Sequence, residues 1–157
     1  MADQVYTVSQ AIEKAKKYCA YQERCQSEVR QKLRAFNITS EEREEVLMNL
    51  IQENYLNEER FSQAYARGKF RIKHWGRKKI VMALKQKDIS EYCIKKGMVE
   101  IDELEYKKVL HELIDKTFDK NRGIQNYQRI AKTAQYVIGR GFESNLVWEQ
   151  LKTYKND

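Results

Sequence analysis

Apolar residues recur at spacings of three and four along most of the chain, which is the spacing of one face of an α-helix. Runs in which Val, Ile and Thr alternate with polar residues, as they do in strands, are missing. Proline, which ends helices, is absent from all 157 residues, and only six glycines occur. The pattern therefore predicts an all-α fold.

Turn signals divide the predicted helices into three groups of three. We predict approximate repeats at 1–54, 55–98 and 99–157, within a single domain that spans 1–157. Each group is too short to bury a core alone, so neighbouring groups are expected to share one. The predicted architecture is tandem three-helix repeats, about three in number, stacked into an elongated, curved array.

The first group contains two capping-box patterns, Thr7–Gln10 before its first helix and Thr39–Glu42 before its third. Its second helix is predicted to start near Ser27. The apolar residues that the third helix is predicted to bury are Val46, Leu47, Leu50 and Ile51.

The second group opens at Asn57, and the pair Trp75-Gly76 separates its first two helices. A short third helix is predicted from near Ser90 to Gly97. The residues predicted to line one face of the first helix are Phe61, Ala64, Tyr65, Gly68 and Ile72.

The third group starts near Ile101, and the loop 119–123 separates its first two helices. Ser144 is predicted to cap the last helix. The apolar stripes of the first two helices are predicted at Tyr106, Val109, Leu110, Leu113, Ile114 and Phe118, and at Tyr127, Ile130, Ala131, Ala134, Val137 and Ile138.

One short segment recurs in all three groups, at 33–39, 84–90 and 137–143. In each copy an apolar residue precedes a second apolar residue by five positions. The steps between copies are regular, at 51 residues and 53 residues. This regularity favours true repeats over the alternative that any pair of amphipathic helices shows such a match by chance.

Positive charge is concentrated in one segment, 60–87, which has no Asp or Glu. The rest of the chain has 20 basic residues against 23 acidic ones, so the excess that gives a net charge of +7 comes from this segment. Like charges without counter-ions favour a polyanion or an acidic protein surface as a partner, and the alternative is a solvated helix face. The basic residues are Arg60, Arg67, Lys69, Arg71, Lys73, Arg77, Lys78, Lys79, Lys85 and Lys87.

Several side chains in this segment receive specific predictions. Arg67, Arg71 and His74 are predicted to share a helix face, and 77–79 to begin the next helix. Trp75 could stack on a base or anchor a protein contact, whereas Phe70 is expected in the core. Arg60 is expected to pair locally with Glu58 or Glu59. Tyr55, Leu56 and Phe61 are expected to pack the junction between groups.

Catalytic and metal-binding patterns are missing. The motifs GxSxG, HExxH, GxxxxGK(S/T) and GxGxxG do not occur. The three cysteines form no CxxC pair, and only two histidines are present, so we expect reduced, buried thiols and no metal or other cofactor. We predict a binding protein and not an enzyme. An enzyme built from scattered residues stays open as an alternative.

No apolar run approaches the roughly 18 residues that a membrane span needs. The first residues, MADQVYTVSQ, have neither a basic start nor an apolar run, so they do not indicate a secretory signal. A cytoplasmic protein without membrane contact is the expectation.

Three stretches resemble the RecX family. Ser27–Leu33 resembles the family's S-x-x-E-(L/V)-x-x-K-L helix with a slightly shifted spacing, and Glu53–Arg67 resembles G-Y-L-(N/D)-(D/E)-E-R-F-A-x-x-Y-(V/A)-R. Gly76–Ile80 resembles the pattern G-x-x-(R/K)-I. The likeness extends over nearly the whole chain, and the middle stretch is its specific part. Two residues depart from the pattern, with Asn54 in place of a common glycine and Ser62 in place of alanine.

The resemblance implies a regulator of the recombinase RecA, in most cases a negative modulator, that binds the RecA filament on single-stranded DNA. Its roles would then lie in homologous recombination, DNA repair and the SOS response. A monomer that contacts DNA without sequence specificity is expected. The alternative is a stand-alone helical DNA-binding protein with a helix-turn-helix-like pair. The residues assigned to contact RecA or DNA are Arg67, Lys69, Arg71, Lys73, His74, Trp75, Arg77, Lys78 and Lys79.

Overall fold

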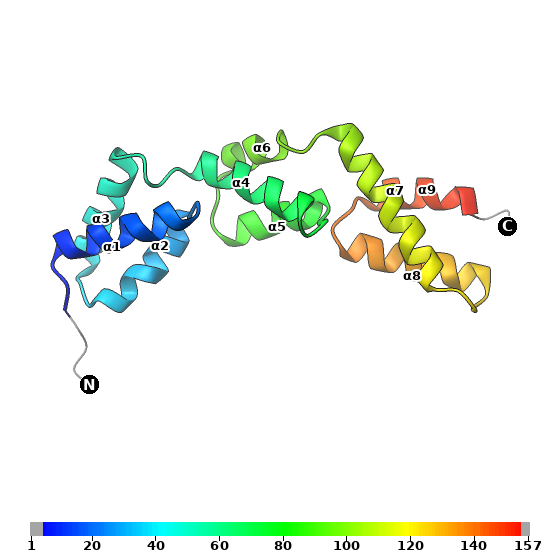
Figure 1. Ribbon diagram of the computed structural model, residues 1–157, viewed down its shortest axis with the longest axis horizontal. Coiled ribbons are helices and arrows are strands. Elements are labelled where there is room, and N and C mark those ends of the chain that lie inside the picture. The colour runs from blue at the N-terminus through cyan, green and yellow to red at the C-terminus, as the bar shows by residue number, and fades with distance from the viewer. Residues whose placement is uncertain (1–4, 155–157) are drawn as a thin grey trace.

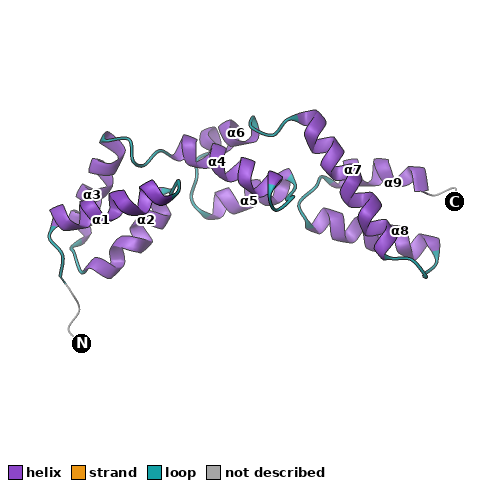
Figure 2. Ribbon diagram, in the orientation of Figure 1, coloured by secondary structure: helices purple, strands orange, loops and turns teal. Residues whose placement is uncertain are grey.

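The computed structural model describes residues 5–154, and this part of the chain is helical and contains no strand (Figures 1 and 2). Residues 1–4, which begin the segment inspected for a secretory signal, lie outside the described residues. Three three-helix repeats follow one another along the long axis, so the predicted all-α tandem-repeat class is confirmed. The predicted repeat boundaries stay a prediction.

The first repeat contains α1 (Val8–Tyr21), α2 (Gln26–Leu33) and α3 (Ser40–Gln52), the middle repeat α4 (Glu58–Arg71), α5 (Arg77–Gln86) and α6 (Glu91–Met98), and the third repeat α7 (Glu103–Lys120), α8 (Asn126–Gly139) and α9 (Ser144–Leu151). Short 3-10 turns follow α2 and α9, at Arg34–Phe36 and Lys152–Tyr154. In the part of the chain that the structure describes, no helix is both long and apolar enough to cross a bilayer.

Most helices begin at the residues that the sequence predicts. Thr7 and Thr39 both form complete capping boxes, and the side chain of Asn57 accepts a hydrogen bond from the Arg60 amide. The prediction for the last helix is wrong by one residue. Its N-cap is Glu143, whose side chain makes no cap bond because it is held by Arg77.

A left-handed residue lies in the turn before the third helix of each repeat. Asn37, Asp88 and Gly141 have φ values of 53°, 60° and 103°. Only glycine, asparagine and aspartate adopt this conformation at low cost, so each turn has a suitable residue. The apolar residue that follows each of them is buried, and these residues are Ile38, Ile89 and Phe142.

The repeats share apolar cores unequally. The first repeat buries its own cluster, which includes Val29, Leu33 and Leu50. The middle and third repeats share a single cluster, which includes Phe70 and Tyr106. The expectation that every repeat depends on a neighbour for its core is therefore wrong for the first repeat.

The buried side of α4 differs from the predicted face. Ser62, Ala66 and Phe70 are buried, whereas Ile72 is 75% exposed. The reason is the position of α6, because a Cβ added to Gly97 would lie only 2.8 Å from the Ser62 carbonyl oxygen. Other residues that were predicted in apolar faces but are exposed are Ile51, Tyr127 and Ala131.

The predicted junction residues are split between the two cores. Leu56 is buried in the first cluster and Phe61 in the second. Tyr55 is 37% exposed, and the Lys16 ammonium lies 5.3 Å from the centre of its ring. For Tyr55, whose ring is partly exposed, packing at the junction stays a prediction.

The backbones of the middle and third repeats meet at two glycines. The Gly76 amide donates to the Arg140 carbonyl over 2.8 Å, and the Lys78 amide donates to the Gly141 carbonyl over 2.9 Å. A Cβ on Gly76 would lie 2.2 Å from the Gly141 carbonyl carbon, so no side chain fits at Gly76 without a backbone shift. This contact fixes the start of α5 against the third repeat.

Candidate polyanion-binding site

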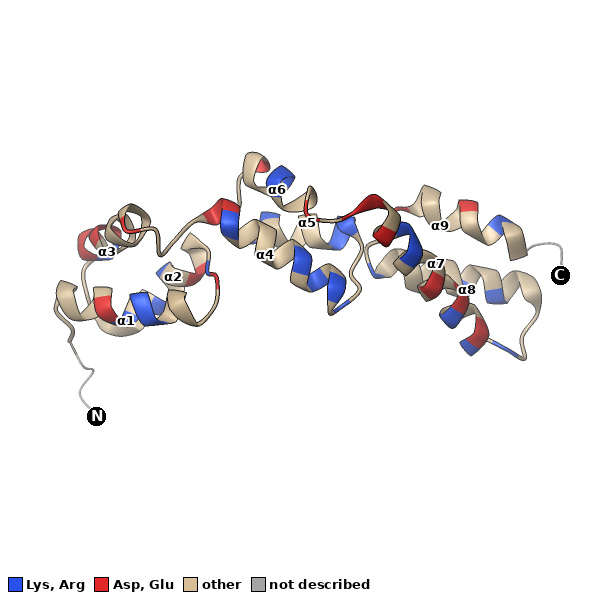
Figure 3. Cartoon of the chain, turned by 45° about the horizontal axis from the view of Figure 1, so that its top comes forward, with Lys and Arg blue, Asp and Glu red and all other residues tan. Residues whose placement is uncertain are grey.

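The basic segment 60–87 spans α4, the turn after it and α5 (Figure 3). Its arginines do have counter-ions, but these come from other parts of the chain. The Arg60 guanidinium lies 2.6 Å from a Glu23 carboxylate oxygen, and that of Arg67 lies 3.0 Å from Glu100. Arg60 therefore pairs with Glu23 and not with Glu58 or Glu59. The predicted absence of counter-ions is likewise wrong for the arginines.

The remaining two arginines pair with the third repeat. Arg71 lies 3.9 Å from Glu105, and Arg77 lies 2.7 Å from Glu103 and 2.6 Å from Glu143. All four arginines of the segment thus face carboxylates that the sequence places outside it.

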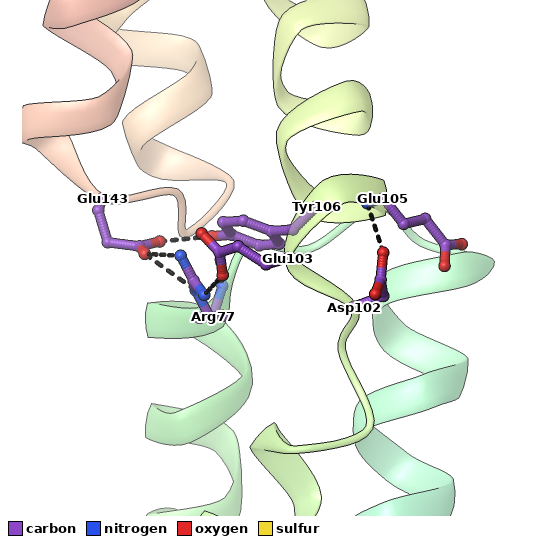
Figure 4. A network of polar contacts seen from close by, with 6 residues as sticks. All are labelled: Arg77, Asp102, Glu103, Glu105, Tyr106 and Glu143. Atoms are coloured by element: carbon purple, nitrogen blue, oxygen red, sulfur yellow. Dashed lines mark hydrogen bonds and ion pairs between the residues drawn. The ribbon is translucent and has the colours of Figure 1, made fainter.

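Arg77 is the centre of a polar network between the middle and third repeats (Figure 4). Its Nε donates to Glu143 over 2.9 Å, and its backbone amide donates to the Tyr106 hydroxyl over 3.0 Å. The Tyr106 hydroxyl in turn donates to Glu143. Tyr106 is fully buried, so its hydroxyl has both a donor and an acceptor within the protein.

Burial and the Glu143 hydrogen bond together raise the pKa of Tyr106. Burial alone would lower the pKa of Arg77, but its hydrogen bonds to Glu103 and Glu143 outweigh that effect and raise it. Arg77 is therefore charged at all ordinary pH values, and its charge is neutralised inside the protein. Sequence reasoning missed Glu143 and Tyr106 because they lie 66 and 29 residues away.

The lysines of the segment differ from the arginines. Lys87 pairs with Glu28 over 3.3 Å, but within residues 5–154 the other five have no carboxylate within ion-pair distance. Charge that is neither paired nor buried stays available to a partner. These unpaired lysines are Lys69, Lys73, Lys78, Lys79 and Lys85.

Trp75 connects two of these lysines. The ammonium groups of Lys69 and Lys79 lie 4.8 Å and 4.4 Å from the centre of its ring. The ring is half-buried and packs against the core shared by the middle and third repeats. Cations over an indole face are stabilised by the ring quadrupole, so both lysines are positioned at the same turn.

The turn at 72–76 sets the position of His74. This residue has φ = 55° and lies beyond the end of α4, so it does not share a helix face with Arg67 and Arg71 as predicted. His74 and Lys73 are exposed. Arg140 of the third repeat donates to the Lys73 carbonyl and adds a further cation, for which no residue near Lys73 in the sequence is a signal.

The predicted site residues therefore separate into two sets. The structure places Lys69, Lys73, His74, Trp75, Lys78 and Lys79 around the α4–α5 turn, whereas Arg67, Arg71 and Arg77 face carboxylates. The first set can bind anionic groups by charge, with an affinity that falls as salt rises. It has no pattern of side chains suited to reading base edges.

The cysteines lie apart from this turn. Cys19 and Cys25 are buried, as predicted, and burial raises the pKa of both thiols, whereas Cys93 is half-buried. Within the residues that the structure describes, no group of three His, Cys, Asp or Glu side chains is arranged to hold a metal ion.

Sequence comparisons connect this arrangement to known proteins. A family model described as "RecX, first three-helix domain" matches residues 11–48, and one described as "RecX, second three-helix domain" matches residues 57–98. "Regulatory protein RecX" of Lactobacillus gasseri is 29% identical over 157 residues, which cover 95% of this chain and 56% of that protein. The protein of the same name from Enterococcus faecalis is 25% identical over 136 residues, covering 87% of this chain and 51% of its own length. The chain thus spans about half the length of the curated relatives it matches.

Solved structures agree in fold. The crystal structure of RecX from Lactobacillus salivarius superposes with a TM-score of 0.83 at 20% identity and covers 96% of this chain and 97% of its own. A second structure, of "regulatory protein RecX", gives a TM-score of 0.80 at 24% identity over 92% of this chain and 74% of that one. The two family models together cover half of the chain, and both belong to one family. The chain belongs to the RecX family.

Proposed function

We propose that this chain regulates the recombinase RecA, as a negative modulator, by binding the filament that RecA forms on single-stranded DNA. The observation that supports the proposal is the set of unpaired lysines around the α4–α5 turn, in a protein of the RecX family. The arginines that share their segment each have a carboxylate within ion-pair distance, so the lysines are the groups whose charge is available to a partner.

The proposed mechanism is binding without a chemical step. Lysine ammonium groups neutralise DNA phosphates or acidic side chains of RecA and release counter-ions. An elongated array that spans neighbouring RecA subunits, or that blocks addition at a filament end, changes filament assembly through binding free energy alone. The protein then acts in the cytoplasm as a monomer and needs no cofactor.

The test is RecA-catalysed ATP hydrolysis on single-stranded DNA, titrated with the native chain and with Lys73→Gln/Lys78→Gln/Lys79→Gln. The matched control is Lys107→Gln/Lys108→Gln/Lys152→Gln, which removes the same charge from exposed lysines of the third repeat. The native chain and the control should lower the rate at substoichiometric amounts, and the middle-repeat variant should require about tenfold more protein. Equal inhibition by all three proteins would show that these lysines do not carry the function, and no inhibition by any of them would refute RecA regulation.

A stand-alone DNA-binding protein is the competing function. Its reading helix would be α6, which has only eight residues and exposes Glu91, Tyr92, Lys95 and Lys96. Tighter binding to one duplex sequence than to a random duplex, with no effect on RecA, would favour this function over filament binding.

A further inference from the structure

The third repeat has a basic hollow of its own, between α7 and α8 and away from the α4–α5 turn. Its volume is about 590 Å³. Leu113 and Thr117 of α7 lie at its less exposed side, and Asn121 follows at the end of that helix. The other residues that line it are Lys116, Lys120, Lys132, Gln135 and Tyr136.

Charge in this hollow has one sign. Lys116, Lys120 and Lys132 line it, and no carboxylate does. Within residues 5–154 none of these three lysines has a carboxylate at ion-pair distance. The neighbouring Asp119 faces Arg122 and Arg129, at 3.5 Å and 3.8 Å. Three uncompensated cations from two helices therefore converge on one concave surface, which favours an anionic ligand.

The hollow also offers an aromatic surface. Tyr136 is 51% exposed, although a large apolar ring usually gains by burial. It lies one helical turn after Lys132, so ring and ammonium are on the same face of α8. The polar side chains at the less exposed side are already hydrogen-bonded within the protein, because Thr117 donates to the Leu113 carbonyl and Asn121 donates to the Thr117 carbonyl. The lysines and the tyrosine are thus the groups that can meet a ligand.

We propose that this hollow is a second binding site for single-stranded DNA, with phosphates on the three lysines and one base stacked on Tyr136. Lysines beside an exposed aromatic ring are the combination that holds single strands without sequence preference. In a duplex the bases are stacked on each other and cannot reach the ring. The inference rests on the proposed function and deepens it, because the strand would contact the third repeat as well as the middle one.

The experiment measures binding of a fluorescent oligothymidylate to the full chain without RecA, over a series of salt concentrations. The charge variant is Lys116→Gln/Lys120→Gln/Lys132→Gln, with Lys107→Gln/Lys108→Gln/Lys152→Gln as the control of equal net charge. The charge variant should bind about tenfold more weakly than the control. Its slope of log affinity against log salt should be smaller by about 2, since each phosphate contact to a single strand contributes about 0.7.

A stacking variant, Tyr136→Leu, separates base contacts from phosphate contacts. It should weaken binding of oligothymidylate by about tenfold but leave binding of an abasic strand of the same length unchanged. Inorganic tripolyphosphate serves as the free-phosphate probe. If tripolyphosphate competes with the oligonucleotide as well as an unlabelled strand does, the site is for free phosphate and the DNA proposal is overturned.

Other outcomes separate this inference from the proposed function. Equal affinity of the charge variant and its control, or equal loss for Tyr136→Leu on both strands, overturns the third-repeat site. The RecA assay with the middle-repeat lysines is unaffected by that result. Conversely, loss of oligothymidylate binding in the charge variant supports the site even if the chain leaves RecA activity unchanged, in which case only the proposed function fails.

Discussion

The two junctions between repeats are built from different interactions. At the first junction, Arg60 forms an ion pair with Glu23, and Lys87 forms one with Glu28. The Gln26 amide also donates a hydrogen bond to Glu58 over 2.9 Å. An open hollow of about 460 Å³ lies along it, lined by residues of both repeats. At the second junction, the repeats share one apolar core and touch at two glycines. Three similar units are therefore joined once mainly by polar contacts and once by a continuous core to which the polar network of Arg77 is added.

This difference has an energetic consequence. Half-exposed ion pairs contribute little to stability, whereas a shared core contributes through every apolar group that both sides bury. Cys25 is the single residue of the first repeat that belongs to the larger cluster within the described part of the chain. We therefore expect the first repeat to unfold separately from a body formed by the middle and third repeats.

The largest expected effect comes from truncating one core residue of the first repeat and, separately, one core residue of the body formed by the middle and third repeats. Leu50 and Leu110 are both almost fully buried, in the first and second clusters, so alanine at either position should cost about 3 kcal/mol. Both tryptophans, Trp75 and Trp148, lie in the second body. In urea, Leu50→Ala should leave the tryptophan fluorescence midpoint unchanged, and Leu110→Ala should lower it. One coincident transition that both variants shift equally would show that the chain is a single cooperative unit.

The glycine contact at the second junction gives the next largest effect. Gly141 has φ = 103°, and a Cβ there would lie 2.4 Å from the Lys79 Cβ, so Gly141→Ala should cost roughly 3 kcal/mol through strain and overlap. Gly139→Ala is the matched control, because nothing lies within 4 Å of its added Cβ and its backbone is helical. The control should be neutral or stabilising by up to about 1 kcal/mol. Thermal unfolding followed by circular dichroism measures both, and equal losses would contradict the close approach.

Ion pairs at the two junctions should differ in strength. A double-mutant cycle on Arg77 and Glu143 should give a coupling energy of about 2 kcal/mol, because two guanidinium nitrogens of Arg77 donate to Glu143 and the Tyr106 hydroxyl donates to the same carboxylate. The same cycle on Arg60 and Glu23, which are 35% and 30% exposed, should give about 0.5 kcal/mol after solvent screening. Urea unfolding of the single and double variants provides the energies. A larger coupling at the first junction than at the second would reverse the comparison.

Alkaline pH should weaken the second junction through Tyr106. The pKa of Tyr106 in the folded protein is above the ordinary value of 10.0, because burial and Glu143 oppose its ionisation. Above pH 10.0 the unfolded chain loses this proton first, so the stability that Tyr106 contributes is full below that pH and declines as pH rises toward the folded-state pKa. Tyr106→Phe should therefore be less stable than the native chain at neutral pH but decline less above pH 10.0. If the free energy of unfolding of the two proteins declines in parallel above pH 10.0, Tyr106 is excluded as the cause of the alkaline loss of stability.

Local sequence chemistry predicted the helix starts and turns well. Capping boxes at Thr7 and Thr39 depend on residues three positions apart, so the sequence displays them directly. Asn54, which departs from the glycine of the family pattern, has φ = 62°. Asparagine is among the few residues that tolerate this conformation, which explains why the substitution is compatible with the fold.

Long-range pairing could not be predicted in the same way. Arg77 and Glu143 are 66 residues apart, and nothing near either one indicates the other. The prediction of which side of α4 is buried was wrong for a related reason. Gly97 of α6 packs against Ser62 and so buries that side of α4, whereas Ile72 lies beyond the end of the helix. Sequence could therefore identify the basic segment but could not separate its arginines, which bind carboxylates, from its unpaired lysines.

We propose that the unpaired lysines of the middle repeat bind the partner, whereas the arginines of the same segment bind carboxylates of this chain. The most direct measurement is the affinity for RecA filaments on single-stranded DNA, taken together with urea unfolding, for Lys78→Met/Lys79→Met and Arg67→Met/Arg71→Met. These variants remove equal charge. The lysine variant should lose about tenfold in affinity with unchanged stability. The arginine variant should keep its affinity and lose at most about 1 kcal/mol of stability, because both of its ion pairs are partly exposed. An arginine variant that stays as stable as the native chain but loses filament affinity as much as the lysine variant would contradict the claim.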